Sequence, residues 1–270
     1  MTDFEKIKSY YVKFDEKNRL NKDASGKFEF EMTMKILDKY LPKDSTILDL
    51  GGGAGVYTFP LAKIGHKVYL SDLSEKLIEQ AKEEKMNQNI TNVISCDVVN
   101  AIDLSIYEDN KFDVVILFGP LYHLTSNEER IKCVKEVKRV LKPNGIVFAS
   151  FIPYLAGSIA IIDRYLRHPE QVTTENLEKV FDNGVFNNAS NNGFQEGAYL
   201  AITQINNLFD DFEKLELRSI RGFGYEKEEQ LYSIQDKTMY NKIIELIDKT
   251  AELNEIIETC GHAIFIGKKK

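Results

Sequence analysis

The chain has 270 residues and a mass of 31.0 kDa, and 43% of its residues are hydrophobic and 29% are charged. These values are typical of a globular domain and exclude collagen-like, low-complexity and wholly disordered chains. The net charge is −7, and basic residues are interleaved with acidic ones along most of the chain. Because binding to a nucleic-acid duplex needs clustered lysine and arginine, we expect no nucleic-acid partner.

The three cysteines, Cys96, Cys133 and Cys260, form no C-x-x-C pair, so neither a zinc site nor a redox motif is predicted. Scattered thiols favour the reducing cytoplasm over a secreted location. The N-terminus carries charges where a signal peptide needs its apolar stretch, and no apolar run approaches the ~20 residues of a membrane span. We therefore expect a cytoplasmic protein with no membrane partner and no metal, and the sequence leaves its oligomeric state open.

The first 44 residues have the pattern of a charged helical cap, in which a loop around 21–26 precedes a helix over about 31–40. The helix is expected to end at Leu41, because the residue before a proline disfavours the α conformation. From Thr46 onward, short apolar runs alternate with helical spacing. We predict strands over 46–50, 68–70, 93–95, 112–118 and 146–151. We predict helices over 56–64, 74–85 (with Ser74 as the N-cap) and 128–141.

This alternation predicts an α/β fold with a doubly wound, mostly parallel sheet and helices on both faces. The rhythm breaks at Ile152, and residues 152–206 are mixed, aromatic and rich in asparagine and glycine. We interpret them as a helical lid inserted over the functional edge of the sheet, the alternative being a surface elaboration without a role. A strand over 215–220, a helix over 240–257 and a strand over 263–266 follow. We therefore expect a single domain over 1–270, made of the cap (1–44), the core (45–151), the insertion (152–206) and the rest of the sheet (207–270).

A glycine loop follows the first predicted strand: residues 49–55 read DLGGGAG, with glycines Gly51, Gly53 and Gly55. Such loops turn tightly from strand to helix and let the backbone approach a ligand closely. The spacing is D-x-G-x-G-x-G and not the dinucleotide pattern G-x-G-x-x-G, whose third glycine would fall at Val56. The loop alone is a weak signal, because it could serve only as a tight turn.

Two acidic residues sharpen this interpretation. Asp72 ends the second predicted strand, where a carboxylate can accept hydrogen bonds from both ribose hydroxyls; the alternative is that it only caps the helix after Ser74. A carboxylate at Asp49 would repel a pyrophosphate, but it would suit a ligand with an amine or a positive sulfur. The site therefore favours a nucleoside without phosphates over NAD.

On these motifs, residues 45–151 resemble the class I S-adenosylmethionine-dependent methyltransferases. Residues 49–55 are similar to their first motif, and Asp72 is similar to their ribose-binding acid. Cys96-Asp97-Val98 is similar to their adenine-binding motif, in which Asp97 would reach the exocyclic amine. The alternative is that Asp97 serves only as a turn residue. Residues 141–145 resemble their L-x-P-G-G turn, with Asn144 in place of the first glycine, a mild departure because asparagine tolerates the left-handed conformation. The resemblance implies a Rossmann-like sheet of seven strands, with the last one antiparallel and beside the fifth.

The resemblance also implies S-adenosylmethionine as the cofactor, with S-adenosylhomocysteine as the product and no metal. Arg19 is a candidate partner for the methionine carboxylate of the donor, or else a surface cation. The predicted cofactor-binding residues are Asp49, Gly51, Gly53, Gly55, Asp72, Leu73, Asp97, Val98, Gly119 and Arg19.

The loop after the fourth predicted strand reads GPLYHL over residues 119–124, which is similar to a stretch of uncharacterised small-molecule members of the superfamily. In the resembled family this loop borders the transferred methyl group. His123 is therefore predicted to remove a proton from the acceptor, with an ordinary pKa of about 6.5, and Tyr122 to orient the acceptor. The alternative is that Leu121 and Leu124 bury the loop and His123 only bonds to the backbone.

These features predict a methyltransferase that acts on an oxygen or nitrogen atom of a small molecule. Methyl transfer from a sulfonium needs alignment and exclusion of water, so a lid is expected from the N-terminal helices and the aromatic insertion. One alternative is a nucleic-acid base methyltransferase, which the acidic charge and the lack of an N/D-P-P-Y/F motif disfavour. The others are an NAD-dependent oxidoreductase and a non-catalytic module that only binds S-adenosylmethionine.

Overall fold

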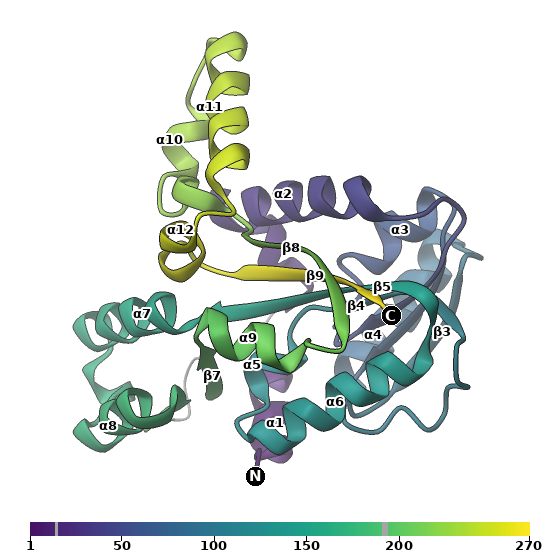
Figure 1. The fold of residues 1–270 in the computed structure, drawn as a ribbon, viewed down its shortest axis with the longest axis horizontal. Helices are drawn as coiled ribbons and strands as arrows, with labels where there is room; N and C mark the ends of the chain where they lie inside the picture. Colours follow the sequence, from purple (N-terminus) through teal and green to yellow (C-terminus); the bar gives the residue numbers. More distant parts are fainter. Residues whose placement is uncertain (14–15, 191–193) are drawn as a thin grey trace.

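The computed structural model describes residues 1–13, 16–190 and 194–270. Five parallel strands in the order β3-β2-β1-β4-β5 form the centre of its sheet. Their bounds are β1 Thr46–Leu50, β2 Lys67–Asp72, β3 Val93–Val98, β4 Phe112–Leu117 and β5 Leu141–Pro153. Beyond β5, the antiparallel strand β9 (Ala263–Lys269) pairs with β5, and β8 (Phe212–Ser219) pairs with β9. The predicted seven-stranded Rossmann-like sheet is thus confirmed (Figure 1).

Helices cover both faces of the sheet. Successive side chains of each strand point to opposite faces, so each strand contributes to two apolar cores. In β1, Ile47 packs in one apolar core and Leu48 in the other. The Ile47 core lies under α2 (Ala24–Tyr40), α3 (Thr58–Lys63) and α4 (Glu75–Gln88). The Leu48 core lies under α5 (Pro120–His123), α6 (Asn127–Val140), α9 (Ile202–Leu208) and α12 (Asn254–Thr259). This doubly wound arrangement leaves the carboxyl ends of β1 to β5 at one common edge.

The N-terminal cap consists of α1 (Phe4–Lys13), the 3-10 helix η1 (Glu16–Asn21) and α2. The predicted helix over 31–40 begins earlier, at Ala24, after Asp23, whose side chain accepts from the Gly26 N–H at 2.8 Å. Ser25 and Gly26 resemble loop residues, but a Cβ at Gly26 would lie 2.6 Å from the carbonyl oxygen of Arg19. Glycine is therefore needed in this first turn because η1 packs closely against it.

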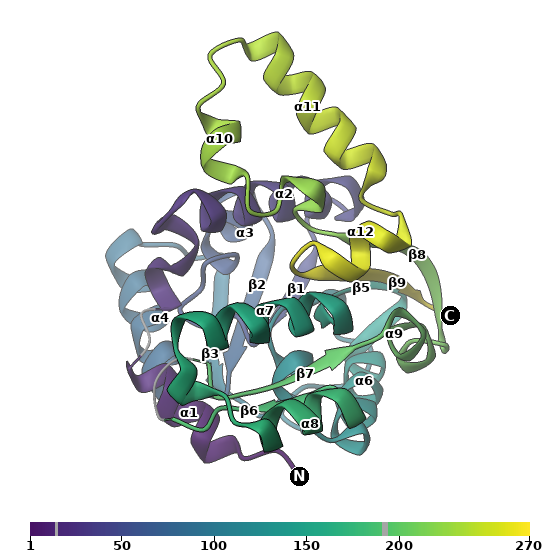
Figure 2. The same cartoon turned by 90° about the vertical axis from the view of Figure 1, so that its left-hand side faces the viewer.

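The insertion over 152–206 is not purely helical. It contains α7 (Tyr154–Arg167), the 3-10 helix η2 (Pro169–Gln171), α8 (Thr174–Asn183) and an antiparallel pair of strands, β6 (Val185–Asn187) and β7 (Glu196–Leu200). Strand β7 pairs with the far end of β5 at Ile152 and Pro153, so the insertion continues the sheet beyond its edge (Figure 2). Part of its asparagine-rich stretch, residues 191–193, lies outside the described residues.

The C-terminal elements differ from the prediction in two places. The helix expected over 240–257 is divided into α11 (Lys237–Thr250) and α12. Helix α11 projects away from the sheet, with η3 (Gly222–Gly224) and α10 (Glu228–Tyr232) at its base (Figures 1 and 2). Strand β9 continues to Lys269, whose ammonium donates to the Leu141 carbonyl at 2.6 Å, so the final lysines are not the solvated tail that their charge suggests.

Local sequence signals were accurate at several turns. Ser74 is the N-cap of α4 and accepts from the Leu77 N–H, and Asn144 has the left-handed conformation expected of it, with φ of 63°. Within the described ranges, no helix has both the length and the apolar character needed to cross a membrane.

Candidate active site

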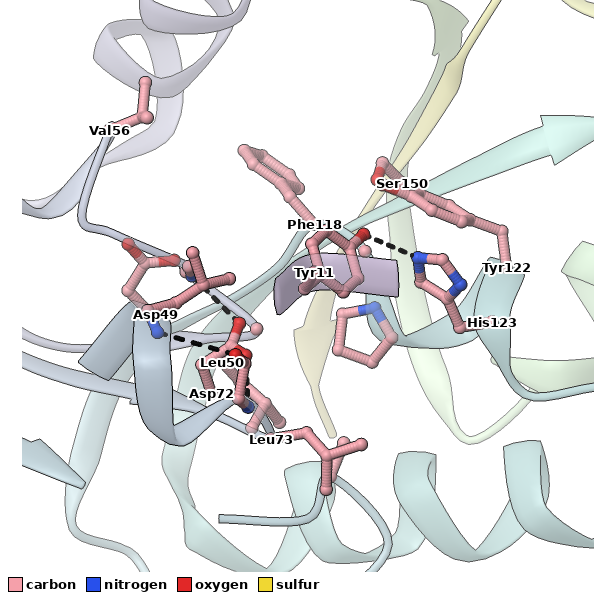
Figure 3. Close-up of a pocket in the computed structure, with 18 of the residues that line it drawn as sticks. Tyr11, Asp49, Leu50, Val56, Asp72, Leu73, Phe118, Tyr122, His123 and Ser150 are labelled. Atoms are coloured by element: carbon pink, nitrogen blue, oxygen red, sulfur yellow. Dashed lines mark hydrogen bonds between the residues drawn. The ribbon is translucent and has the colours of Figure 1, made fainter. Parts of the chain in front are cut away.

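A pocket opens at the carboxyl ends of β1, β2, β4 and β5, the edge where open α/β sheets bind their ligands. Figure 3 shows its two ends. Asp49, Leu50, Asp72 and Leu73 lie at one end, and Phe118, Tyr122, His123 and Ser150 lie at the other, with Tyr11 of the cap between them. The pocket thus combines an acidic end with an aromatic end, and each is built from a different set of strands.

The glycine loop forms the floor of the acidic end. Gly51, Gly53 and Gly55 have φ angles of 75°, 58° and 93°, which only glycine adopts at little cost. A Cβ at Gly51 would lie 2.6 Å from the Pro120 ring, so the loop after β4 can approach this turn only because residue 51 is glycine. Gly51 and Gly53 line the pocket, whereas Gly55 lies outside it and packs against Phe59.

The loop is locked to β2 by hydrogen bonds. The N–H groups of Gly51 and Gly52 donate to the Ser71 carbonyl at 2.7 and 3.1 Å. Asp72 accepts from the Gly53 N–H at 2.9 Å and from the Ser74 N–H at 2.8 Å. Asp72 therefore joins the glycine loop to the start of α4. Leu73 follows it and also lines the pocket.

Asp49 is fully buried beneath the loop. Its Oδ2 accepts from the Thr58 hydroxyl at 2.6 Å, whereas Oδ1 is buried and has no hydrogen-bond partner among the described residues. Burial, opposed by Thr58 and helped by the nearby Asp72 charge, raises the pKa of Asp49 to about 6. A positive group in the pocket would favour the ionised form and satisfy Oδ1. The acidic end thus fits a ligand with a cationic centre.

The predicted adenine-binding residues Asp97 and Val98 lie at the end of β3. Strand β3 continues to Val98, so Asp97 lies within the strand, and its Oδ2 accepts from the Ser95 and Tyr107 hydroxyls at 2.6 and 3.2 Å. Neither Asp97 nor Val98 lines the pocket. The pocket is lined instead by residues 99–101, which include Asn100. Strand β3 thus runs three residues further than the predicted bounds of 93–95.

At the aromatic end, His123 is buried and both of its ring nitrogens are engaged. Nδ1 lies 3.3 Å from the Glu196 carbonyl oxygen, which can only accept, so Nδ1 carries the proton and Nε2 accepts from the Tyr11 hydroxyl at 2.8 Å (Figure 3). Burial lowers the pKa of His123 to about 4, with the Glu196 bond opposing this shift. The expectation of an ordinary pKa near 6.5 is therefore wrong.

The N-terminal segment covers the aromatic end. Besides the Tyr11–His123 bond, the N–H of Thr2 donates to Glu129 on α6 at 3.0 Å, and the N–H of Asp3 donates to Glu196 on β7 at 3.3 Å. Several side chains of this segment line the pocket, namely Phe4, Ile7, Lys8, Tyr11, Arg19 and Leu20. Within the described ranges no residue of 152–206 lines the pocket, although the Glu196 carbonyl oxygen of this insertion lies 3.3 Å from Nδ1 of His123.

A charged cluster forms the wall of the pocket beside the aromatic end. Glu29 of α2 lies at its centre, 3.1 Å from Arg19, 3.2 Å from His262 and 3.7 Å from Arg221. Burial opposes ionisation of Glu29, but His262, Arg19 and Arg221 together hold its pKa well below its usual range. Arg19, predicted as a ligand of the donor, thus lies in the pocket wall and bonds to Glu29. Sequence analysis missed Glu29 and His262 because 233 positions separate them.

No group of three or more histidine, cysteine, aspartate or glutamate side chains suited to a metal ion occurs in the part of the chain that the structure describes.

Comparison with known proteins agrees with this geometry. Residues 48–149 match the methyltransferase domain family. A ribosomal protein L11 methyltransferase of Dictyoglomus thermophilum is 33% identical over 122 residues, which are 45% of this chain and 37% of that protein. The aligned region therefore spans less than half the length of this curated relative.

Two solved structures share the fold over nearly the whole chain. A protein of Pyrococcus horikoshii OT3 covers 97% of this chain and 99% of its own, with a TM-score of 0.64 and 20% identity. Magnesium protoporphyrin IX methyltransferase of Synechocystis PCC 6803, solved with bound SAH, covers 99% of both chains, with a TM-score of 0.58 and 15% identity. Residues 48–149 thus match a methyltransferase domain, and the solved structures share its Rossmann-like fold.

Proposed function

We propose that this protein transfers a methyl group from S-adenosylmethionine to an oxygen or nitrogen atom of a small-molecule acceptor. The observation that carries the proposal is a single pocket in which the acidic end, with Asp49 and Asp72, is continuous with the aromatic end at Tyr122 and His123. One end has the chemistry for a cationic nucleoside and the other for a partly apolar acceptor.

Each end of the donor has candidate partners. The two oxygens of Asp72 would accept from the ribose hydroxyls, and Asn100 with Leu73 and Leu77 would contact the adenine. The glycine turn at Gly51 and Gly53 would lie against the rest of the nucleoside. The unpartnered Oδ1 of Asp49 supports a positively charged group nearby.

When bound, the donor supplies a methyl group already activated by its positive sulfur. The protein then has to hold the acceptor in line with that methyl and exclude water. Phe118, Tyr122 and Tyr11 form aromatic walls suited to holding a small acceptor, and α1 covers them. His123 holds the Tyr11 hydroxyl in place, and this hydroxyl would face the acceptor.

The covered pocket supports a small acceptor over a macromolecule, because three separate contacts tie the N-terminal segment across its aromatic end. The GPLYHL loop supports the same assignment through its likeness to small-molecule members of the superfamily. Nucleic-acid methylation is disfavoured by the net charge of −7. Unpaired cysteines support a cytoplasmic location.

Calorimetry with S-adenosylmethionine, S-adenosylhomocysteine and NAD tests the donor assignment. We expect the first two to bind and NAD to give no measurable heat; tighter binding of NAD would overturn the assignment. Transfer of a labelled methyl group to the low-molecular-mass fraction of a cell extract, compared with its protein and nucleic-acid fractions, tests the acceptor class. Donor binding without transfer to any fraction would favour a non-catalytic binding module.

A further inference from the structure

His262 enters the pocket wall from the far end of the chain. It directly precedes β9, whose first residue, Ala263, pairs with Phe151 near the carboxyl end of β5. Antiparallel pairing therefore brings the start of β9 to the same edge as the ends of β4 and β5. The imidazole stacks on the Tyr122 ring, with centroids 5.5 Å apart and planes inclined by 24°, and it lines the pocket.

The ring is oriented by a buried carboxylate. Nδ1 of His262 lies 3.2 Å from Oε2 of Glu29, and a carboxylate can only accept, so Nδ1 donates. Burial opposes ionisation of this carboxylate, but His262, with Arg19 and Arg221 flanking it, holds its pKa well below its usual range. In the neutral imidazole, Nε2 then carries the lone pair, and no group among the described residues hydrogen-bonds to it. This is the arrangement of a general base held by an acidic partner.

His123 has no comparable lone pair, because its Nε2 accepts from Tyr11 and its Nδ1 donates to the Glu196 carbonyl. It is also buried, whereas the His262 side chain is 26% exposed. A proton accepted by His262 could therefore pass on to solvent. Of these two pocket histidines, the geometry thus favours His262 for proton removal and leaves His123 to hold Tyr11.

We propose that Nε2 of His262 takes the proton from the methyl acceptor and that Glu29 is its positioning residue. The inference rests on the proposed function and deepens it: the acceptor is a hydroxyl or amine that still carries its proton when it binds. Its oxygen or nitrogen lone pair forms the bond to the methyl carbon, its proton passes to Nε2, and the electron pair of the broken carbon–sulfur bond stays on the sulfur.

Charged and aromatic groups from several parts of the fold surround His262. Glu29 of α2 contacts it directly, Arg19 of η1 and Arg221 after β8 approach that carboxylate, and Tyr122 of α5 covers the ring. Glu228 pairs with Arg221 at 2.8 Å and balances its charge.

The tautomer of His262 can be measured without an acceptor. In ¹⁵N-histidine-labelled protein saturated with S-adenosylhomocysteine, the His262 signals are assigned by their loss in His262→Gln. We expect a protonated Nδ1 and an unprotonated Nε2 in the neutral ring, and a shifted tautomer balance in Glu29→Gln, because a neutral amide can also donate to Nδ1. A ring protonated at Nε2 in the unmodified protein would overturn the proposal.

Turnover provides the second measurement, with tyramine as a probe that offers both a phenolic hydroxyl and an amine. His262→Gln should lower kcat by about 10²–10⁴-fold, as for loss of a general base, while S-adenosylhomocysteine affinity stays within about threefold. Added imidazole should restore part of the rate in His262→Ala. Tyramine methylation by His262→Gln at the unmodified rate would refute the base role, whereas failure of the unmodified protein to bind S-adenosylhomocysteine would instead refute the proposed function.

Discussion

Replacing Asp72 tests the donor site most directly, because its carboxylate has both a structural and a proposed binding role. In the structure, its two oxygens accept from the Gly53 and Ser74 N–H groups at 2.9 and 2.8 Å. The proposed ribose contacts add one donor to each oxygen. Hydrogen bonds to a charged acceptor contribute about 1.5–3 kcal/mol each, so Asp72→Ala should cost about 3–6 kcal/mol of binding free energy, or at least ~100-fold in Kd.

Asp72→Asn is the matched control, since it keeps the size of the side chain and one acceptor oxygen but loses the charge. Neutral hydrogen bonds contribute about 0.5–1.5 kcal/mol, so its loss of affinity should lie between those of the unmodified protein and Asp72→Ala. The Kd for S-adenosylhomocysteine from calorimetry and the thermal midpoint should be recorded for all three proteins. A lower thermal midpoint without ligand would report the loss of the Asp72 hydrogen bonds to the loop. A higher Kd at an unchanged midpoint would report the loss of ligand contacts.

A 2′-deoxy analogue of S-adenosylhomocysteine isolates the ribose contact. If Asp72 binds both ribose hydroxyls, the analogue should bind the unmodified protein about tenfold or more weakly, as expected for the loss of one bond worth at least about 1.5 kcal/mol. Replacing Asp72 with alanine should then weaken the analogue less than it weakens S-adenosylhomocysteine, because only the 3′-hydroxyl contact remains to be lost. Two outcomes would mean that Asp72 serves only to hold the loop and cap α4. Asp72→Ala would weaken the binding of both ligands by the same factor, or it would bind S-adenosylhomocysteine within about threefold of the unmodified protein.

Two further predictions follow from the corrected site. Asn100→Ala should weaken S-adenosylhomocysteine binding by about tenfold, as expected for the loss of one good hydrogen bond. Asp97→Ala should leave the Kd unchanged and lower the thermal midpoint, because Asp97 bonds within the fold. The reverse pattern in calorimetry would support the adenine role of Asp97. The folded pKa of His123, about 4, lies below its unfolded value of about 6.5, so the unfolded state takes up the proton first and stability is lost as the pH falls from about 6.5 towards 4. Between pH 7.5 and pH 5, the free energy of unfolding measured in urea should therefore fall by about 2 kcal/mol less in His123→Asn than in the unmodified protein. Equal losses in the two proteins would show that His123 is not buried in its neutral form.

Much of the core was predictable because its signals are local. A strand buried on both faces is mostly apolar, and such apolar stretches mark β1 and β4 in the sequence even though each contains one aspartate. The glycine loop and Asp72 were predictable for a related reason, since a tight strand-to-helix turn restricts the residues that can occupy it. Both occur where the sequence places them, at the end of β1 and at the end of β2.

Prediction failed where a residue's role depends on a neighbour far away in the chain. Gly26 has the local pattern of a loop, yet it lies in the first turn of α2, where η1 packs too closely to leave room for a Cβ. Asp97 has the pattern of a strand exit, but β3 continues past it in register with β2, and this pairing moves the exit to Asn100. In each case a contact between elements overrides the local preference.

The sequence by itself determined the class of fold, the edge of the sheet that carries the site and the acidic end of the pocket, because those depend on periodicity and on residues within one turn of each other. Only the tertiary structure decided what closes the pocket and which histidine has a free lone pair. The crossing of α1 over the sheet places Tyr11 on His123, and the antiparallel return of β9 places His262 on Glu29. Hydrogen bonds formed at such distances in the chain set the tautomer of each ring, and no local pattern records them.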